Sequence, residues 1–435
     1  MKIKTPKPAD VNNKVVIVRV DYNVPLQEKN GKITVVDDRR VRNSLDTVNF
    51  LLENQAKVIL ISHLGRPEGI SLSENIDNDS KNKFSDKNKK LSLEPVAKHM
   101  KKEFTLNVEF VADCVGSSVK EAVNNLQPGQ ALLLENLRFY KEEKENDKNF
   151  AKELANLAQL YINEAFSNSH RSHASMVGIP NYLPTFAGFA LEKEIKNLKK
   201  LITNPKKPFV MVIGGAKISD KVEAVTNLNK IADVVLVGGG VANNFLKAEG
   251  IEVHKSFLQD TPADLKKQDI DYIQVADDLI EDNRTEKILK DGYIPLPKLI
   301  YPIDVIAAKN LESTKTQTIE LVRNVKDTDD DKDLMYLDIG PKTIRLFQEI
   351  ILQAGTVFWN GPMGVFEKPQ FEEGTKEIAR AIAKTGATTI LGGGDTLGAI
   401  DKFGLEERFD YVSAAGGAAL DFLAGKELPG LEALE

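Results

Sequence analysis

Residues 209–225 read FVMVIGGAKISDKVEAV, and this stretch decides the fold class. The run FVMVI (209–213) predicts a buried strand, GGAK (214–217) a turn, and ISDKVEAVTNLNKI (218–231) an amphipathic helix. The next apolar run, DVVLVG (233–238), leads directly into another glycine turn, GGGVANN. A strand, a glycine turn, a helix and a further strand are the repeating unit of a parallel α/β sheet.

The same alternation runs through the whole chain. Further strands are expected at 15–20, 57–62, 108–112, 131–134 and 160–165 in the first half, and at 356–359, 388–392 and 409–413 in the second. The charged segment 184–202 between the halves predicts a long connecting helix. The expected fold class is α/β: two doubly wound parallel-sheet (Rossmann-like) domains, 1–183 and 203–412, joined by this helix with a cleft between them.

Composition excludes several classes of protein. A length of 435 residues suggests two or three domains, and a formal net charge of -6 argues against a nucleic-acid partner. Cys114 is the only cysteine, so neither an intrachain disulfide nor a cysteine-based zinc site is expected. The start MKIKTPKPAD has no apolar signal core, and no run is long enough for a membrane span. We therefore expect a soluble, cytoplasmic protein without a membrane partner.

Four glycine turns in the second half follow predicted strands: GGAK, GGGVANN, GGGDTLGAI (392–400) and AAGGAALDFL (414–423). Where a strand ends and a helix begins, free N–H groups attract anions, and glycine lets a phosphate approach the backbone. Lys217 and Lys221 are four residues apart and share a face if the helix starts early, and Asp395 suits helix capping or a phosphate-bridging metal. Close packing alone explains any one such turn, but four of them favour a nucleotide.

The stretch FWNGPMGVFE (358–367) adds polar groups near another strand end. Glu367 is placed to accept hydrogen bonds from ribose hydroxyls, and Asn360 lies where the strand ends. Trp359 is interpreted as a core residue.

The first half carries a basic pattern instead. Asp21 and Asn23 follow one predicted strand, and cations or histidines follow others: Arg39, Arg40, Arg42, His63, Arg66, Arg138, His170, Arg171 and His173. Arginine forks bind phosphate and carboxylate groups in a bidentate manner. The HRSH spacing is a weak metal signal, because an arginine stands beside the histidines and no carboxylate partner is near. The polar stretch 73–90 and the acidic stretch 326–333 are interpreted as solvated loops.

One half thus suits a nucleotide and the other a small, highly anionic substrate. Phosphoryl transfer works mainly by positioning and charge neutralisation, and a carboxylate acceptor needs no base because it is already ionised. Two rivals remain: a non-catalytic binding or scaffold protein on the same fold, and a dehydrogenase-like nucleotide fold. The absence of G-x-G-x-x-G disfavours the second.

With these stretches quoted, the chain resembles the phosphoglycerate kinase family over nearly its full length. The motifs are RVDYNVPL, SHLGRP, LLLENLRF, HRSHAS, GGAKISDK, LDIGPKT, FWNGPMGVFE and GGGDT. The resemblance implies reversible transfer from 1,3-bisphosphoglycerate to MgADP, giving 3-phosphoglycerate and MgATP, in a monomer that closes by hinge bending. It also implies a hinge that involves the 184–202 helix and the segment near 413–418, and a final segment, 413–435, that returns to the N-terminal domain.

The resemblance also implies roles for individual residues, matched motif by motif. Phosphoglycerate would be bound by Asp21, Asn23, Arg40, His63, Arg66, Arg138 and Arg171. Arg40, Lys217 and the backbone at Gly394 would stabilise the transferring phosphoryl group, and Asp395 would bind Mg²⁺. The nucleotide would contact Gly215, Ala216, Lys217, Lys221, Gly239, Asn360, Pro362, Glu367, Gly393, Asp395 and Thr396, with Thr396 capping its helix near the phosphates.

Two segments depart from the family pattern. Members usually read close to NDAFGTAHRAHAS where this chain has NEAFSNSHRSHAS (163–175), so Ser167 replaces a glycine. SAAGGAAL (413–420) stands where STGGGASL is common, so Ala414 lacks a hydroxyl associated with the hinge.

Overall fold

The computed structural model describes residues 3–70, 88, 90–259, 270–283, 297–321 and 331–435. Nearly all of the 73–90 stretch and most of 326–333 lie outside these residues. The chain forms two compact units. Unit 1 comprises Met1–Lys196 and Glu427–Glu435, and unit 2 comprises Asn197–Lys426. The boundary falls inside helix α9 (Phe189–Thr203).

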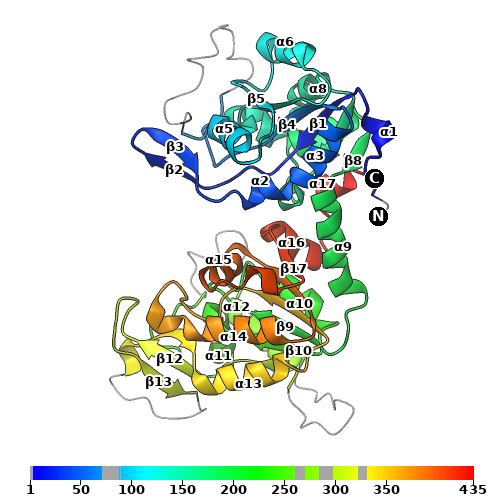
Figure 1. The fold of residues 1–435 in the computed structure, drawn as a ribbon. Helices are drawn as coiled ribbons and strands as arrows, with labels where there is room; N and C mark the ends of the chain where they lie inside the picture. Colours follow the sequence, from blue (N-terminus) through cyan, green and yellow to red (C-terminus); the bar gives the residue numbers. More distant parts are fainter. Residues whose placement is uncertain (1–2, 71–87, 89, 260–269, 284–296, 322–330) are drawn as a thin grey trace. The chain divides into compact units, whose positions relative to one another are not determined.

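Unit 1 is built on a six-stranded sheet in the order β5-β6-β4-β1-β7-β8 (Figure 1), with every pairing parallel. Its strands are β1 (Val15–Arg19), β4 (Lys57–Ile61), β5 (Val108–Val111), β6 (Ala131–Leu134), β7 (Leu160–Asn163) and β8 (Thr185–Ala187). The first five were expected from their apolar runs, which suit a sheet buried on both faces. The helix expected over 184–202 instead starts at residue 189, because 185–187 pairs with β7 as the edge strand.

Helices of unit 1 cover this sheet, and a two-stranded hairpin extends from it (Figure 1). The helices are α1 (Pro8–Val11), α2 (Arg39–Asn43), α3 (Leu45–Glu53), α5 (Glu94–Glu103), α6 (Ser117–Asn125), α7 (Lys141–Glu145), α8 (Lys148–Ala155) and α17 (Pro429–Glu432), and the hairpin strands are β2 (Leu26–Lys29) and β3 (Lys32–Val35). On one face, Val18 and Leu60 of the sheet share a core with Val48 of α3 and Met100 of α5. Burial of such side chains contributes about 1.5–3 kcal/mol each.

Both ends of the described chain are tied into unit 1. Ala187 N–H donates to Lys4 C=O (2.8 Å), and Gly430 N–H donates to Ser169 C=O (2.8 Å). The segment that returns to unit 1 is residues 427–435 rather than all of 413–435, since 414–426 lies in unit 2.

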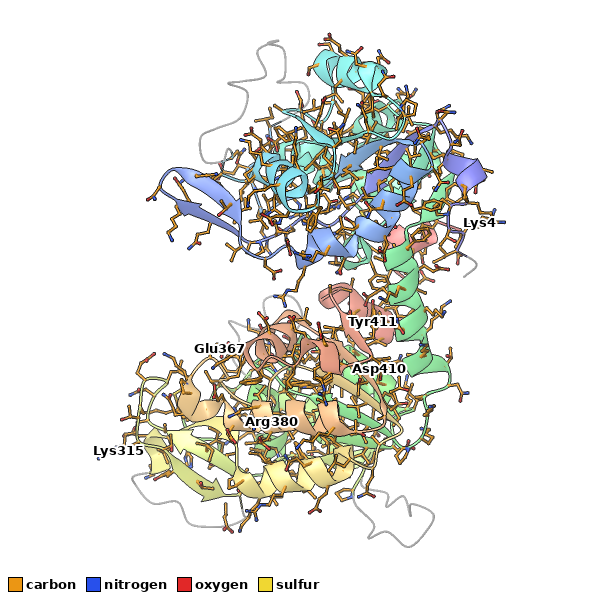
Figure 2. The ribbon with its side chains drawn as sticks, viewed as in Figure 1. Lys4, Lys315, Glu367, Arg380, Asp410 and Tyr411 are labelled. Carbon is orange, nitrogen blue, oxygen red and sulfur yellow. The ribbon has the colours of Figure 1, made fainter. Side chains whose placement is uncertain are left out.

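Unit 2 repeats the plan with a second parallel six-stranded sheet, in the order β11-β10-β9-β15-β16-β17. Its strands are β9 (Phe209–Ile213), β10 (Val234–Val237), β11 (Leu299–Ile300), β15 (Thr356–Asn360), β16 (Thr388–Gly392) and β17 (Tyr411–Ser413). Asp410 lies just before the edge strand β17 (Figure 2) and accepts a hydrogen bond from Thr389 N–H (2.8 Å). A smaller antiparallel sheet, β13-β12-β14, was not expected; it comprises β12 (Asp304–Ala308), β13 (Gln317–Glu320) and β14 (Met335–Ile339).

Alternate residues of β9 explain why helices cover both faces of the unit 2 sheet. Val210 and Val212 share a core with Phe347 of α13 and Ile378 of α14, whereas Ile213 lies among side chains of α10, α11 and α12. The helices are α10 (Val222–Asn229), α11 (Gly239–Ala248), α12 (Tyr272–Glu281), α13 (Pro341–Ile351), α14 (Glu373–Lys384), α15 (Gly394–Lys402) and α16 (Gly417–Leu423). Trp359 is fully buried in this core, as expected.

None of the helices among the described residues combines the length and the apolar character that crossing a bilayer requires.

Candidate functional site

In unit 1, the predicted polar residues gather where β1, β4 and their neighbours end. The Asp21 carboxylate accepts a hydrogen bond from the Arg40 guanidinium and another from the Ser167 hydroxyl. Asn23 N–H donates to the other Asp21 oxygen (3.2 Å). Asp21 therefore holds the side chain of Arg40, and Ser167, a departure from the family pattern, joins this contact through its side chain.

A second set of bonds links the β4 loop to the turn that carries Arg138. Gly65 N–H donates to the Asn23 side-chain oxygen (2.9 Å), and the Arg138 guanidinium donates to Gly65 C=O (2.7 Å). Asn136, fully buried, accepts from Leu64 N–H (3.1 Å) and so fixes the same loop. Loops from three parts of the sequence are thus held at one edge of the sheet.

The arginines of this edge repel one another. Burial, together with the charges of Arg171, Arg19 and Arg66, lowers the pKa of Arg138 to about 10, and Glu143 opposes this shift. Burial also lowers the pKa of Arg171, with Arg19, Arg66 and Arg40 adding to the effect and Asp21 opposing it. Like charges held together in a partly buried place favour the binding of an anion.

Two histidines of the same edge, His63 and His173, have lowered pKa values. Burial holds the pKa of His63 well below its ordinary value, and the charges of Arg19, Arg138 and Arg171 act in the same direction. Burial and the same arginines lower the pKa of His173 to about 3. Neither imidazole adds charge to the cluster near pH 7. The structure thus brings together all seven predicted residues of unit 1, which we call the basic cluster: Asp21, Asn23, Arg40, His63, Arg66, Arg138 and Arg171.

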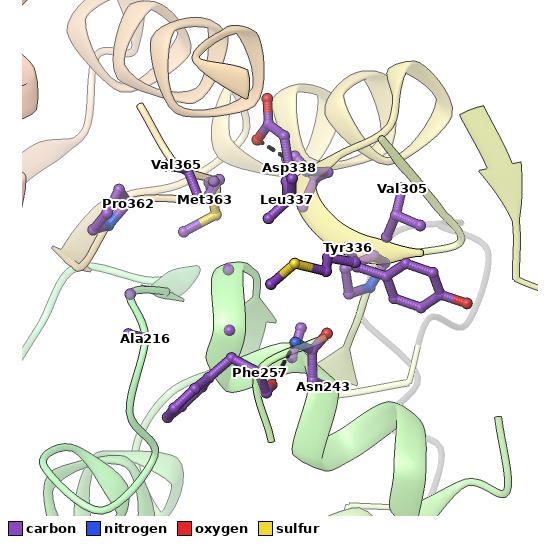
Figure 3. A pocket seen from close by; sticks show the side chains of 18 of the residues that line it. Ala216, Asn243, Phe257, Val305, Tyr336, Leu337, Asp338, Pro362, Met363 and Val365 are labelled. Atoms are coloured by element: carbon purple, nitrogen blue, oxygen red, sulfur yellow. Dashed lines mark hydrogen bonds between the residues drawn. The ribbon is translucent and has the colours of Figure 1, made fainter. Parts of the chain in front are cut away.

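Unit 2 contains a pocket of about 470 Å³ at the ends of its strands (Figure 3). Six predicted residues line it: Gly215, Ala216, Gly239, Pro362, Glu367 and Asp395. Met363 and Val365 lie across the pocket from Asn243 and Phe257 (Figure 3). Most of the lining is apolar, with few polar groups, which is typical of a site for a small ligand with a flat apolar part.

The glycine turns bring backbones into direct contact at this pocket. Gly215 N–H donates to Pro362 C=O (2.7 Å), and Gly239 N–H donates to Met363 C=O (3.0 Å). A Cβ on Gly239 would lie 2.8 Å from both Gly215 N and Pro362 O, and its φ of +61° is one that L side chains rarely adopt. Glycine is therefore required here by close approach as well as by conformation.

Lys217 and Lys221 do not share a helical face, because α10 begins only at Val222. Residues 219–221 form a turn before this helix, held in part by a hydrogen bond from Ser219 N–H to the Gln259 side chain (3.0 Å). Lys221 lies beside Gly215, and burial lowers the pKa of its ammonium group while Asp220 and Asp395 oppose the shift. Lys217 is exposed and is not part of the pocket lining.

The turn before α15 also differs in detail from the prediction. Gly393, not Asp395, is the N-cap of this helix, and no side chain caps it; exposed Asp395 is in the first turn. The Thr396 hydroxyl accepts a hydrogen bond from Gly361 N–H (2.7 Å), so it joins α15 to the end of β15 and does not cap the helix. The Asn360 side chain lies against Gly393, and Gly394 is exposed as the first residue of α15.

Comparison with known proteins decides the family. A sequence model described as phosphoglycerate kinase matches residues 7–426. The chain belongs to the phosphoglycerate kinase family. A phosphoglycerate kinase from Pseudothermotoga lettingae is 44% identical over 435 residues, which is 100% of this chain and 99% of that protein.

Solved structures agree with this family. The structure of phosphoglycerate kinase from Coxiella burnetii has a TM-score of 0.76 and 36% identity, and covers 98% of this chain and 96% of its own. Phosphoglycerate kinase from Pyrococcus horikoshii has a TM-score of 0.77 and 31% identity, with the same coverage. Like the other members of the phosphoglycerate kinase family, this chain is a phosphotransferase with a carboxyl group as acceptor.

Sequence reasoning missed several residues of both candidate sites. Arg19 lies within a buried strand and is fully buried, and an arginine inside an apolar run was the available signal. In unit 2, Asn243, Phe257 and Tyr336 line the pocket, as does Asp338, and only the LDIGPKT motif pointed toward this region.

Proposed function

We propose that this chain carries out the phosphoglycerate kinase reaction with the basic cluster of unit 1 and the pocket of unit 2. The basic cluster would bind 3-phosphoglycerate or 1,3-bisphosphoglycerate, and the pocket would bind ADP or ATP. The observation that carries this assignment is the group of mutually repelling, partly buried arginines, which an anionic ligand would relieve. Asp21 and Asn23 offer oxygens to the hydroxyl of the substrate.

Transfer breaks the bond between the acyl oxygen and phosphorus in 1,3-bisphosphoglycerate and forms a bond from phosphorus to the terminal oxygen of ADP. In the reverse direction, the carboxylate of 3-phosphoglycerate attacks the γ-phosphorus of ATP. No proton has to be removed from this acceptor, so positioning and charge neutralisation supply the catalysis. Arg40, Lys217 and the N–H of Gly394 would stabilise the charge on the moving phosphoryl group.

Mg²⁺ would be held by Asp395 together with phosphate oxygens of the nucleotide. Among the described residues there is no group of three or more histidines, cysteines and carboxylates able to hold a metal by themselves. One exposed carboxylate at the pocket fits Mg²⁺, which commonly uses one or two carboxylates, substrate phosphates and water. When bound, the ion would offset negative charge on the phosphates.

Within the pocket, Glu367 would bind the ribose hydroxyls and Lys221 the phosphates. Gly215, Ala216, Gly239, Asn360, Pro362, Gly393 and Thr396 would shape the backbone around the nucleotide. We further propose a cytoplasmic monomer in which the two units close on their ligands about a hinge in α9 and residues 413–418. Closure would exclude water from the acyl phosphate. Small-angle scattering should then detect compaction when both ligands are bound, and unchanged dimensions would refute the closure.

The test of the function is ADP production from MgATP by the purified chain, with and without 3-phosphoglycerate. Turnover that depends on 3-phosphoglycerate is expected. Binding of both ligands without turnover would support the scaffold alternative and would contradict the assigned roles. Asp395→Asn should raise the Mg²⁺ concentration required for half-maximal rate, and Asp401→Asn, an exposed acidic residue of the same helix, is the matched control.

A further inference from the structure

A buried chain of hydrogen bonds runs from a carboxylate to the basic cluster of unit 1. Glu143 is fully buried and accepts from Ser175 through both oxygens, from N–H (2.9 Å) and from the hydroxyl (2.6 Å). The Ser175 hydroxyl oxygen in turn accepts from Arg19 Nε (2.9 Å). Neither Glu143 nor Ser175 has a role in the proposed reaction. Their contact with Arg19 is the feature that connects them to the basic cluster.

Ser175 contacts Arg19, and all three nitrogens of the Arg19 guanidinium have contacts that restrain its rotation. Nε donates to Ser175, one terminal nitrogen donates to Val20 C=O, and the other lies 3.2 Å from His63 Nδ1. Arg19 and Glu143 are both fully buried; burial raises the pKa of the Glu143 carboxyl group, and the charge of Arg19 and the hydrogen bonds from Ser175 oppose this shift. The Arg19 nitrogen that faces His63 is therefore fixed in place.

The contact with Arg19 determines where His63 carries its proton. A guanidinium donates hydrogen bonds and accepts none, so His63 Nδ1 must be the acceptor and cannot carry hydrogen. A neutral imidazole with a bare Nδ1 carries its hydrogen on Nε2. Among the described residues nothing hydrogen-bonds to Nε2, so this N–H is available to a ligand. A hydrogen on His63 Nδ1 would place this N–H donor directly against an N–H donor of Arg19.

We propose that Arg19, anchored by Glu143 and Ser175, is a positioning residue that fixes His63 as the neutral Nε2–H tautomer, so that His63 donates a hydrogen bond to an oxygen of phosphoglycerate. The binding half of this statement rests on the proposed function, whereas the tautomer in the ligand-free protein does not. A neutral His63 binds phosphoglycerate by donating a hydrogen bond. It carries no positive charge that would be lost as the pH rises. The groups that face His63 are Arg19, Arg138, Arg171 and His173, and all of them oppose its protonation.

The first experiment is ¹⁵N NMR of the ligand-free chain labelled at its five histidines, with the His63 signal assigned from a His63→Gln sample. The expected result is an Nε2–H tautomer that does not change between about pH 5.5 and pH 8, since the ordinary histidine pKa is about 6.5. An Nδ1–H tautomer, or titration within this range, would overturn the proposal. This experiment needs no variant of Arg19 and no turnover.

The second experiment compares Arg19→Met with Tyr161→Phe. Tyr161 is also fully buried, and its hydroxyl donates to Ser175 C=O (2.8 Å). Tyr161→Phe therefore tests whether weaker packing around Ser175 alone changes His63, because it leaves the Arg19–His63 contact in place. Arg19→Met should give a mixture of the two neutral tautomers of His63 and a KM for 3-phosphoglycerate that rises roughly tenfold or more. The KM for MgATP should stay the same, and Tyr161→Phe should keep the original tautomer.

The tautomer of His63 and the KM for 3-phosphoglycerate test the positioning role of Arg19 and the binding role of His63 separately. A purely structural role for Arg19 would reduce the amount of folded enzyme yet leave the tautomer of His63 unchanged, and that result would refute the proposal. If the expected tautomer is found but no variant affects 3-phosphoglycerate binding, the substrate role proposed for His63 fails while the positioning by Arg19 stands. If Arg19→Met does not fold, the spectrum of the unaltered chain decides.

Discussion

Glu164 provides a test of how burial controls stability. It follows β7 and accepts hydrogen bonds from the Thr47 hydroxyl (2.8 Å) and from Ala190 N–H (3.1 Å) at the start of α9. Burial raises its pKa from 4.5 to about 8. The folded chain therefore keeps a proton that the unfolded chain releases, so the stability this group contributes is complete below about pH 4.5 and is lost as the pH rises toward about pH 8. At about 1.36 kcal/mol per pH unit, the loss is about 3 kcal/mol by about pH 7.

Glu164→Gln removes this titration and keeps the size of the side chain. Urea unfolding followed by circular dichroism, from about pH 5 to about pH 8, should show the variant gaining about 3 kcal/mol relative to the unaltered chain as the pH rises. Glu192→Gln is the matched control, because Glu192 is exposed in the first turn of α9, the helix whose Ala190 N–H donates to Glu164. If the difference between the Glu164→Gln variant and the unaltered chain is the same at every pH, Glu164 is ionised when folded and the reasoning is wrong.

Three further variants test unit 2. Lys217→Ala should lower kcat by about 100-fold or more while the free energy of unfolding, measured in urea, changes by less than about 0.5 kcal/mol, because Lys217 is exposed; full-rate turnover would remove Lys217 from the mechanism. Gly239→Ala should destabilise the chain by about 1–3 kcal/mol and weaken ATP binding measured by calorimetry, since the added Cβ would meet backbone atoms at 2.8 Å. Thr396→Val should cost about 1–3 kcal/mol in denaturation, because buried Gly361 N–H loses its acceptor, whereas Thr396→Ser should not.

Apolar runs predicted both parallel sheets because their strands are buried on both faces, where few residue types fit. The smaller antiparallel sheet was missed because β13 (Gln317–Glu320) is mostly exposed and polar, so its pairing with β12 leaves no pattern in the sequence. The early start assigned to α10 was wrong because a tertiary hydrogen bond from Ser219 to Gln259 stabilises turns there. No local pattern encodes such a contact.

Sequence patterns likewise predicted one part of the candidate sites and missed another. Cations after strands pointed to the basic cluster, because parallel strands end at one edge. The remaining features depend on burial, which the sequence does not reveal. Asp338 lines the pocket with a carboxyl group whose pKa burial raises to about 8, and Glu143 reaches Arg19 only through Ser175. A charged residue on the surface and one in the interior look alike in a sequence.

The chain begins in unit 1, builds all of unit 2, and returns for its last nine residues, 427–435. During synthesis, unit 1 can therefore be completed only after every residue of unit 2 has been made, although unit 1 was begun first. The hydrogen bond from Gly430 to Ser169 joins the two parts of unit 1 that the sequence separates. Because Lys4 and Gly430 are each hydrogen-bonded to other residues of unit 1, the ends can be joined and the chain reopened in an exposed loop of unit 2, giving a circular permutant in which unit 1 is synthesised without interruption.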